Sequence, residues 1–237
     1  MNLFRSVVFI AALAGLVAGL AMTGLQAAFT VPLILQAEVF EGAAEHGHDA
    51  AAPAHEHEEE GWSPADGAER LAFTALANVV TGVGFALLLV VASELAGGLV
   101  GWRKGLIWGL AGFAIFTLAP GLGLPPELPA MPAADITARQ VWWVLTASAT
   151  AAGLALIAFR PSALLAALGI VLLVFPHLVG APQPPSHETP IPPDLLHRFV
   201  VAVTMTNLVF WAVLGVLVGL FRPRFGKGLA PPQGSLA

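Results

Sequence analysis

Four histidines and five carboxylates lie within the fifteen-residue segment 46–60. The candidate metal ligands of this segment are His46, His48, Asp49, His55, Glu56 and His57. Imidazole together with carboxylate suits divalent ions such as Co, Ni, Zn and Cu, whereas Mg and Ca prefer sites made of oxygen alone. The surrounding Ala, Gly and Pro residues cannot build a core, so the segment predicts a flexible metal-capture loop or, alternatively, a solvated acidic loop.

A second group of candidate ligands lies beside the apolar stretches further along the chain. Its members are Glu127, His177, His187 and His197, with Met131 and Asp135 close to Glu127 in the sequence. Each histidine alone is more typical of a structural residue than of a ligand. Together with Glu127, Met131 and Asp135, the three histidines predict a site through which a metal ion enters the protein.

Several other chemistries are excluded or unsupported. Cysteine is absent, which excludes disulfides, thiolate metal sites and cysteine nucleophiles. The chain contains no phosphate-binding loop, dinucleotide-binding fingerprint, zinc-protease motif or nucleophile elbow. Its few lysines and arginines do not cluster as a nucleic-acid partner would require. We therefore expect neither an enzyme nor a prosthetic group.

The composition indicates which elements must position these ligands. Hydrophobic residues make up 57% of the 237 residues and charged residues only 11%, whereas a soluble domain carries about 25% charged residues. Six stretches without acidic or basic residues are about long enough to cross a bilayer. They are 7–28, 71–93, 105–126, 140–159, 161–188 without its polar end, and 199–221. The sequence therefore predicts an all-α membrane protein with six transmembrane helices.

The chain is expected to have four parts. Residues 1–36 form a first transmembrane helix, which is too long for the apolar core of a signal peptide. Residues 37–69 form an acidic, His-rich outer loop that is largely disordered. Residues 70–222 hold the remaining five helices, and 223–237 form a cytoplasmic tail.

The charges indicate how the chain is oriented. Seven basic residues lie on one side of the predicted spans, namely Arg5, Arg103, Lys104, Arg160, Arg222, Arg224 and Lys227, and three lie on the other, namely Arg70, Arg139 and Arg198. Because basic residues favour the cytoplasmic side, both termini are expected in the cytoplasm and the His-rich loop outside, in the periplasm or extracellular space. Residues 38–70 carry a net charge of −9, and the rest of the chain carries +4.

Three of the four aspartates are followed by an arginine four positions later. These pairs are Asp66/Arg70, Asp135/Arg139 and Asp194/Arg198. The simpler interpretation is that each Asp caps a helix and pairs with the Arg one turn later. The alternative is that three helical hairpins repeat in parallel around an axis normal to the membrane.

Two further patterns predict packing inside the bundle. The spacings Gly15/Gly19, Gly105/Gly109 and Gly215/Gly219 allow helices to approach closely. Glu94 is expected at the cytoplasmic end of its span, where it would pair with Arg103 or Lys104.

Distinctive runs of residues extend over nearly the whole chain. They include FTVPLILQAE at 29–38, WSPADGAER at 62–70, LPPELP at 124–129, ARQVWW at 138–143 and PHLVGAPQP at 176–184. In these runs the chain resembles the CbtA family of proposed cobalt transporter subunits. The resemblance implies a bacterial inner-membrane protein that serves cobalt supply for cobalamin biosynthesis, with a small His-rich membrane partner, CbtB. It also implies five spans rather than six, and the difference concerns the stretch broken by Pro176.

We therefore expect the membrane subunit of a cobalt uptake transporter, or one for a similar divalent metal, whose outward His/Glu-rich loop captures the ion. Two alternatives stay open. One is a membrane metal sensor or accessory protein that transports nothing, and the other is a metal exporter.

Overall fold

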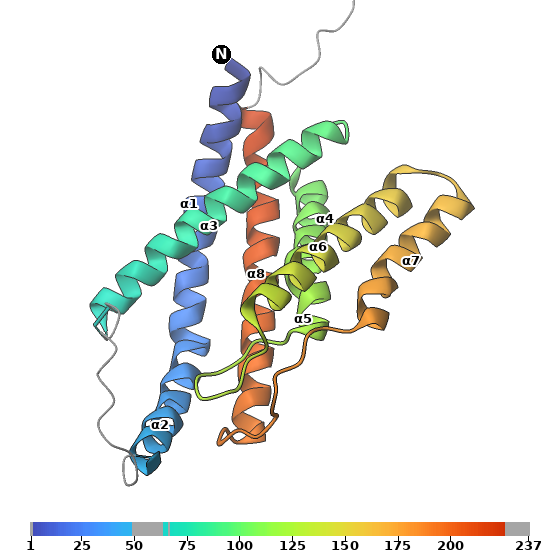
Figure 1. Cartoon of the computed structure of the whole chain (residues 1–237). Coiled ribbons are helices and arrows are strands. Elements are labelled where there is room, and N and C mark those ends of the chain that lie inside the picture. Colours follow the sequence, from blue (N-terminus) through green and yellow to red (C-terminus); the bar gives the residue numbers. More distant parts are fainter. Residues whose placement is uncertain (1, 49–63, 66, 226–237) are drawn as a thin grey trace, which may run out of the picture. The chain divides into compact units, whose positions relative to one another are not determined.

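The computed structural model describes residues 2–48, 64, 65 and 67–225, and these contain helices, turns and loops but no strand. Figure 1 labels the elements. They are α1 (Asn2–Phe29), α2 (Val31–His48), α3 (Ala68–Leu95), α4 (Trp102–Phe113), the π-helical turn η1 (Ala114–Leu118), α5 (Ala119–Gly123), α6 (Ile136–Phe159), α7 (Ala163–Val179) and α8 (Pro193–Phe225).

Within the described residues, five helical segments are long and apolar enough to cross a membrane. They are Phe4–Phe29, Ala68–Leu95, Trp102–Gly123, Ile136–Phe159 and Pro193–Arg224. The fifth predicted span, 161–188, is shorter than expected, because α7 ends at Val179 and Gly180 follows with φ 86°. Its 17 residues correspond to about 25 Å of helix, less than the bilayer core of about 30 Å. The prediction of an all-helical membrane protein is confirmed, and the count of six spans is not.

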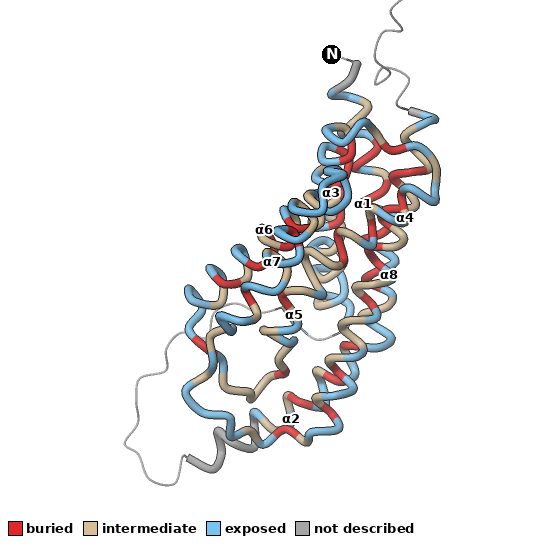
Figure 2. Tube along the Cα trace, turned by 90° about the vertical axis from the view of Figure 1, so that its right-hand side faces the viewer, coloured by how far each residue is buried: buried red, intermediate tan, exposed pale blue. Residues whose placement is uncertain are grey.

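Most of the apolar surface of these helices is exposed in the structure (Figure 2). Only between 22% and 44% of each candidate span is buried. Leu164 and Leu178 of α7 are both 79% exposed. A soluble protein would not leave this much apolar side chain in water, so the exposed faces suit contact with lipid.

The chain divides into two compact units, which we describe separately. The first contains Met1–Gly24, Thr74–Thr117 and Asn207–Ala237, and the second contains Leu25–Phe73 and Leu118–Thr206. Helices α1, α3 and α8 each contribute residues to both units.

Glycines bring the helices of the first unit into backbone contact. A Cβ atom added to Gly105 of α4 would lie 2.2 Å from the carbonyl oxygen of Gly215 in α8. A Cβ atom added to Gly15 of α1 would lie 2.3 Å from the backbone nitrogen of Val83 in α3. The glycines four residues later also lie against backbone, because a Cβ atom would be 2.6 Å from the Val79 Cα atom at Gly19 and 2.2 Å from the Trp211 carbonyl oxygen at Gly109. The packing predicted from the glycine spacing is therefore confirmed.

Aromatic and polar contacts complete the core of this unit. Trp211 of α8 is 2% exposed and stacks on Phe116 of η1, with ring centroids 5.6 Å apart and planes 6° apart. The Asn78 side chain donates a hydrogen bond of 3.1 Å to the Thr23 hydroxyl, which connects α3 to α1. Each buried polar group in apolar surroundings needs such a partner.

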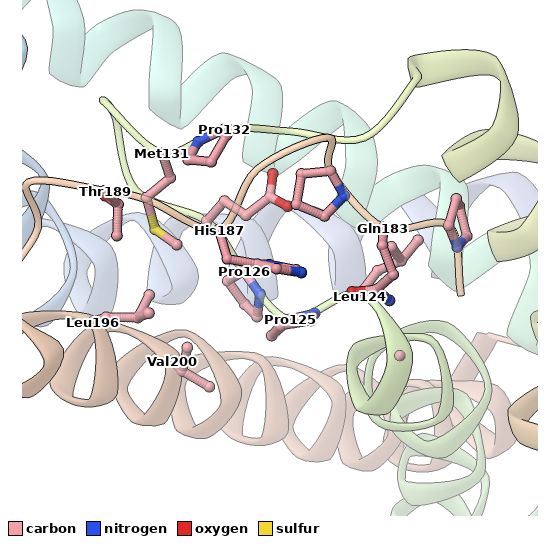
Figure 3. Close-up of a pocket in the computed structure, with 14 residues that line it drawn as sticks. Leu124, Pro125, Pro126, Met131, Pro132, Gln183, His187, Thr189, Leu196 and Val200 are labelled. Carbon is pink, nitrogen blue, oxygen red and sulfur yellow. The ribbon is translucent and has the colours of Figure 1, made fainter. Parts of the chain in front are cut away.

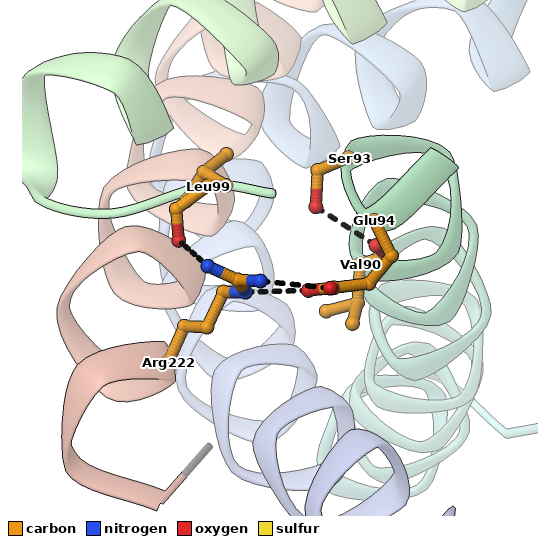
Figure 4. A network of polar contacts seen from close by, with 5 residues as sticks. All are labelled: Val90, Ser93, Glu94, Leu99 and Arg222. Carbon is orange, nitrogen blue, oxygen red and sulfur yellow. Dashed lines mark hydrogen bonds and ion pairs between the residues drawn. The ribbon is translucent and has the colours of Figure 1, made fainter. Parts of the chain in front are cut away.

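An ion pair joins the ends of α3 and α8 (Figure 4). Arg222 donates from Nη2 to the Glu94 carboxylate at 2.7 Å and from Nη1 to the Leu99 carbonyl oxygen at 2.8 Å. The expectation that Glu94 pairs with Arg103 or Lys104 is wrong, because both of those side chains are exposed at the start of α4. The turn after α3 instead brings the Leu99 carbonyl and Glu94 to the same guanidinium group.

The second unit is built around the α6–α7 hairpin and a smaller core formed by α2, α8 and the loops. Gly153 and Gly169 let α6 and α7 meet, since a Cβ on either would lie 2.7 Å from the carbonyl oxygen of the other. The smaller core buries Leu33, Leu128, Ile191, Leu195 and Phe199.

Helix α2 extends into the segment that was expected to be a loop from residue 37 onward. It continues to His48, and Ala37 is buried in the smaller core. The alanines and glutamates of this stretch are good helix formers, which accounts for the extension. The rest of the predicted loop lies outside the described residues, apart from Pro64, Ala65 and Gly67–Glu69.

The backbone contact at Gly105 predicts that Gly105→Ala destabilises the protein. Because the new methyl group would overlap the Gly215 carbonyl oxygen, we expect the free energy of unfolding to fall by about 1–3 kcal/mol. Denaturant unfolding in detergent micelles measures this. Gly84→Ala is the matched control, since nothing lies within 4 Å of a Cβ at Gly84. Equal effects of the two substitutions would contradict the assigned contact.

The ion pair predicts a second stability effect, for Glu94→Gln. Removing the carboxylate leaves the Arg222 guanidinium, whose side chain is 12% exposed, without its anion. We expect a loss of about 1–3 kcal/mol in the free energy of unfolding. Lys104→Gln should leave stability unchanged in the same assay. If Lys104→Gln lowered the free energy of unfolding by as much, Lys104 would be a partner of Glu94, as the sequence predicted.

Candidate metal-binding pocket

The second unit contains a cavity of about 180 Å³, which we call the proline pocket. Its walls are residues 123–127, Met131 and Pro132, residues between 182 and 189, and Leu196 and Val200 of α8. Figure 3 shows Met131, Pro132 and His187 on one side, facing Leu196 and Val200 on the other. Two of the predicted site residues, Glu127 and His187, line this pocket together.

Proline is the most frequent residue in the walls of the pocket. Five lining residues are prolines, which have carbonyl oxygens but no N–H group, namely Pro125, Pro126, Pro132, Pro182 and Pro184. The Gln183 amide nitrogen donates to the Ala181 carbonyl oxygen at 3.0 Å, so its amide oxygen is left as the free group. A pocket of this kind suits a cation better than an anion.

Glu127 supplies the carboxylate of the pocket, and Arg139 neutralises it. The Glu127 Oε2 atom lies 2.9 Å from Arg139 Nη2, and the Glu127 side chain is 25% exposed. The sequence favoured Asp135 as the partner of Arg139. Asp135 instead caps α6, where its Oδ1 accepts the Ala138 N–H at 2.8 Å. The predicted cap is confirmed, and the arginine reaches across to the loop for its ion pair.

The arginine of the first Asp/Arg pair, Arg70, also forms an ion pair with a glutamate outside the pair. Arg70 Nη2 lies 2.9 Å from Glu38 Oε1, so α3 is tied to α2. Asp66 lies outside the described residues. Asp194 lies in the first turn of α8, and both it and Arg198 are exposed.

The other two predicted histidines lie elsewhere. The His177 ring on α7 packs edge-on against Trp142 of α6, with centroids 5.9 Å apart, and His197 is exposed on α8. Across the described part of the chain, no three His, Asp or Glu side chains are grouped so that they could hold a metal ion. Glu127, His177, His187 and His197 thus do not form one four-ligand cluster here.

The candidate ligands of the acidic segment mostly lie outside the described residues. Asp49, His55, Glu56 and His57 belong to the undescribed stretch. His46 and His48 lie on the last turn of α2, and only their backbone is described.

Sequence reasoning missed three contributions to the pocket. Gln183 and Thr189 line it, and Arg139 holds its carboxylate. The proline-rich runs at 124–129 and 176–184 carried the only available signal, since they frame Glu127 and Gln183. The ion pair between Arg139 and Glu127 was not predicted, because the four-residue spacing favoured Asp135 as the partner of Arg139.

The comparisons with known proteins identify the family of the chain. A family model described as "probable cobalt transporter subunit (CbtA)" matches residues 4–222. No curated protein and no solved structure matches the chain. Since the family match covers most of the chain, which also has five helices able to cross a membrane, this multi-pass membrane protein belongs to the CbtA family of cobalt transporter subunits.

Proposed function

We propose that the chain is the membrane subunit that carries cobalt, or a similar divalent transition metal, into the cell. The observation that carries the proposal is the family match over residues 4–222. The family description names a subunit, which implies a partner. We propose a small His-rich membrane protein of the CbtB type as that partner, working in the bacterial inner membrane.

The proposed topology has six crossings, with both termini in the cytoplasm. Helix α7 supplies the sixth crossing, because it packs along α6 through Gly153 and Gly169 after a connection of only three residues. Its 17 residues reach the lower limit for a spanning helix, about 17 residues. The excess of arginine and lysine on the terminal side supports this orientation, and the threefold hairpin repeat is part of the same proposal.

Outside the membrane, the proposed route begins at the His/Glu-rich segment. Its imidazoles and carboxylates would raise the local concentration of divalent metal. The ion would then enter the proline pocket, where Glu127 and His187 offer an oxygen and a nitrogen ligand. Histidines 177 and 197 are proposed as transient ligands on the approach, since His197 directly follows the lining residue Leu196.

The Arg139 guanidinium gives the pocket its charge balance. Because Arg139 already occupies one Glu127 oxygen at 2.9 Å, an arriving cation competes with it for the carboxylate. A divalent ion outcompetes a single positive charge more readily than a monovalent ion does. The ion pair thereby favours divalent cargo.

Uptake by cells lacking other importers tests the proposal. With the partner subunit present, cells that express this chain should accumulate cobalt faster than cells with an empty vector, and parallel assays with nickel and zinc rank the metals. Purified protein in proteoliposomes should carry the same flux. Faster loss of preloaded cobalt would indicate an exporter, and no flux in either direction would indicate an accessory protein.

Deleting residues 45–60 tests the capture step. A loop that only concentrates the ion matters when metal is scarce, so cobalt uptake should fall at limiting supply and recover at saturating supply. Replacing the four histidines of this segment by alanine, with its carboxylates retained, separates imidazole binding from charge attraction. Unchanged uptake of the deletion variant at limiting cobalt would overturn the capture role.

A further inference from the structure

We infer that the Met131 thioether is a third ligand in the proline pocket and determines which divalent ions the pocket accepts. The inference rests on the proposed function and adds to it the basis of metal selectivity. Met131 lines the cavity together with Glu127 and His187.

A turn with an unusual backbone positions Met131. The Met131 N–H donates to the Leu128 carbonyl oxygen at 3.3 Å, which closes a four-residue turn with Pro129 second and Ala130 third. Ala130 has φ 63°, and among the described residues it is the only one other than glycine with positive φ. The third position of a type II turn requires such a φ and normally holds glycine, because a Cβ atom is disfavoured there.

The surroundings hold this turn in place. Leu128 is 4% exposed in the smaller core, beside Ile191 and Leu195. On the other side, the Thr189 hydroxyl lies 3.5 Å from the Ala130 carbonyl oxygen as a hydrogen-bond donor. A disfavoured conformation persists only where its neighbours determine it, and such positions cluster at functional sites.

The same turn orients the sulfur atom. The Leu128 N–H donates to Met131 Sδ at 3.4 Å. A thioether sulfur has two lone pairs, so one remains for a ligand. Figure 3 shows the Met131 side chain opposite Leu196 and Val200 of α8, in the pocket that His187 also lines.

The three side chains offer one oxygen, one nitrogen and one sulfur ligand. Mg²⁺ and Ca²⁺ prefer oxygen ligands, whereas thioether and imidazole favour softer transition-metal ions. A cavity of about 180 Å³ also has room for several waters, at about 30 Å³ each, to complete the coordination shell. Met131 would therefore exclude the abundant hard cations and retain cobalt-like ions.

Met131→Leu tests the inference, because leucine keeps the volume and removes the sulfur. The full-length protein is purified with His46, His48, His55 and His57 replaced by alanine, which removes the imidazole ligands that the loop would offer to the probe. With Co²⁺ alone as probe, X-ray absorption at the cobalt edge should show a sulfur neighbour that Met131→Leu abolishes. Cobalt affinity should fall by about tenfold or more, and Mg²⁺ affinity should not fall.

One control variant and one further test variant accompany this measurement. Met205→Leu makes the same change at a methionine that is 52% exposed and does not line the pocket, so its affinity and spectrum should match the parent protein. Ala130→Gly keeps the sulfur but relaxes the turn, so it should weaken cobalt binding without lowering the stability of the fold.

The outcomes separate this inference from the proposed function. In one outcome, Glu127→Gln and His187→Ala weaken cobalt binding, Met131→Leu does not, and no sulfur neighbour is seen. The inference about Met131 is then overturned, and the proline pocket is still the metal site. If none of the three substitutions alters cobalt binding, the pocket itself is not the metal site, and the inference is overturned with it.

Discussion

Backbone contact between helices at glycine is the constraint on which the first unit depends. Lipid is as apolar as leucine, so helices inside a membrane gain little by burying apolar side chains against each other. They are held instead by close packing, which here requires glycine at Gly15, Gly105 and Gly215. Once the backbones meet at these points, Trp211 is enclosed and can stack on Phe116. Glycines therefore allow the approach of the helices that enclose the core of this unit.

Three arginines of the helical body form ion pairs near helix ends. Arg70 and Arg139 lie in the first turns of their helices and Arg222 in a last turn, and each pairs with a glutamate. These pairs tie loops and neighbouring helices together where the chain leaves the apolar segments. The apolar windows of the candidate spans contain at most two charged residues each. In the function that we propose, the loops that form the proline pocket would therefore recognise the divalent ion.

The proline pocket combines rigidity with a local backbone cost. Its prolines restrict the loops and remove N–H donors that would repel a cation. Ala130 accepts a conformation that glycine would adopt more easily, and the packed Leu128 keeps it there. Glycine at this position would suit stability better, so the alanine is consistent with a demand for a fixed position of Met131.

The sequence by itself determined the features that depend on local patterns. Long uncharged stretches predicted the helices, glycine spacing predicted the contacts at Gly105 and Gly215, and Asp135 was recognised as a helix cap. Helix periodicity and capping involve residues within one or two turns, so they can be read along the chain. The runs of residues shared with the CbtA family likewise identified the family without a structure.

Only the tertiary structure decided which distant residues meet. Arg139 pairs with Glu127 rather than Asp135, and Glu94 pairs with Arg222, 128 positions away, rather than with its near neighbours. The structure also ended α7 at Val179 and grouped Glu127, Met131 and His187 in one pocket while His177 packed against Trp142. These outcomes depend on the paths of loops and on competition among several partners. Spacing along the chain does not encode either of them.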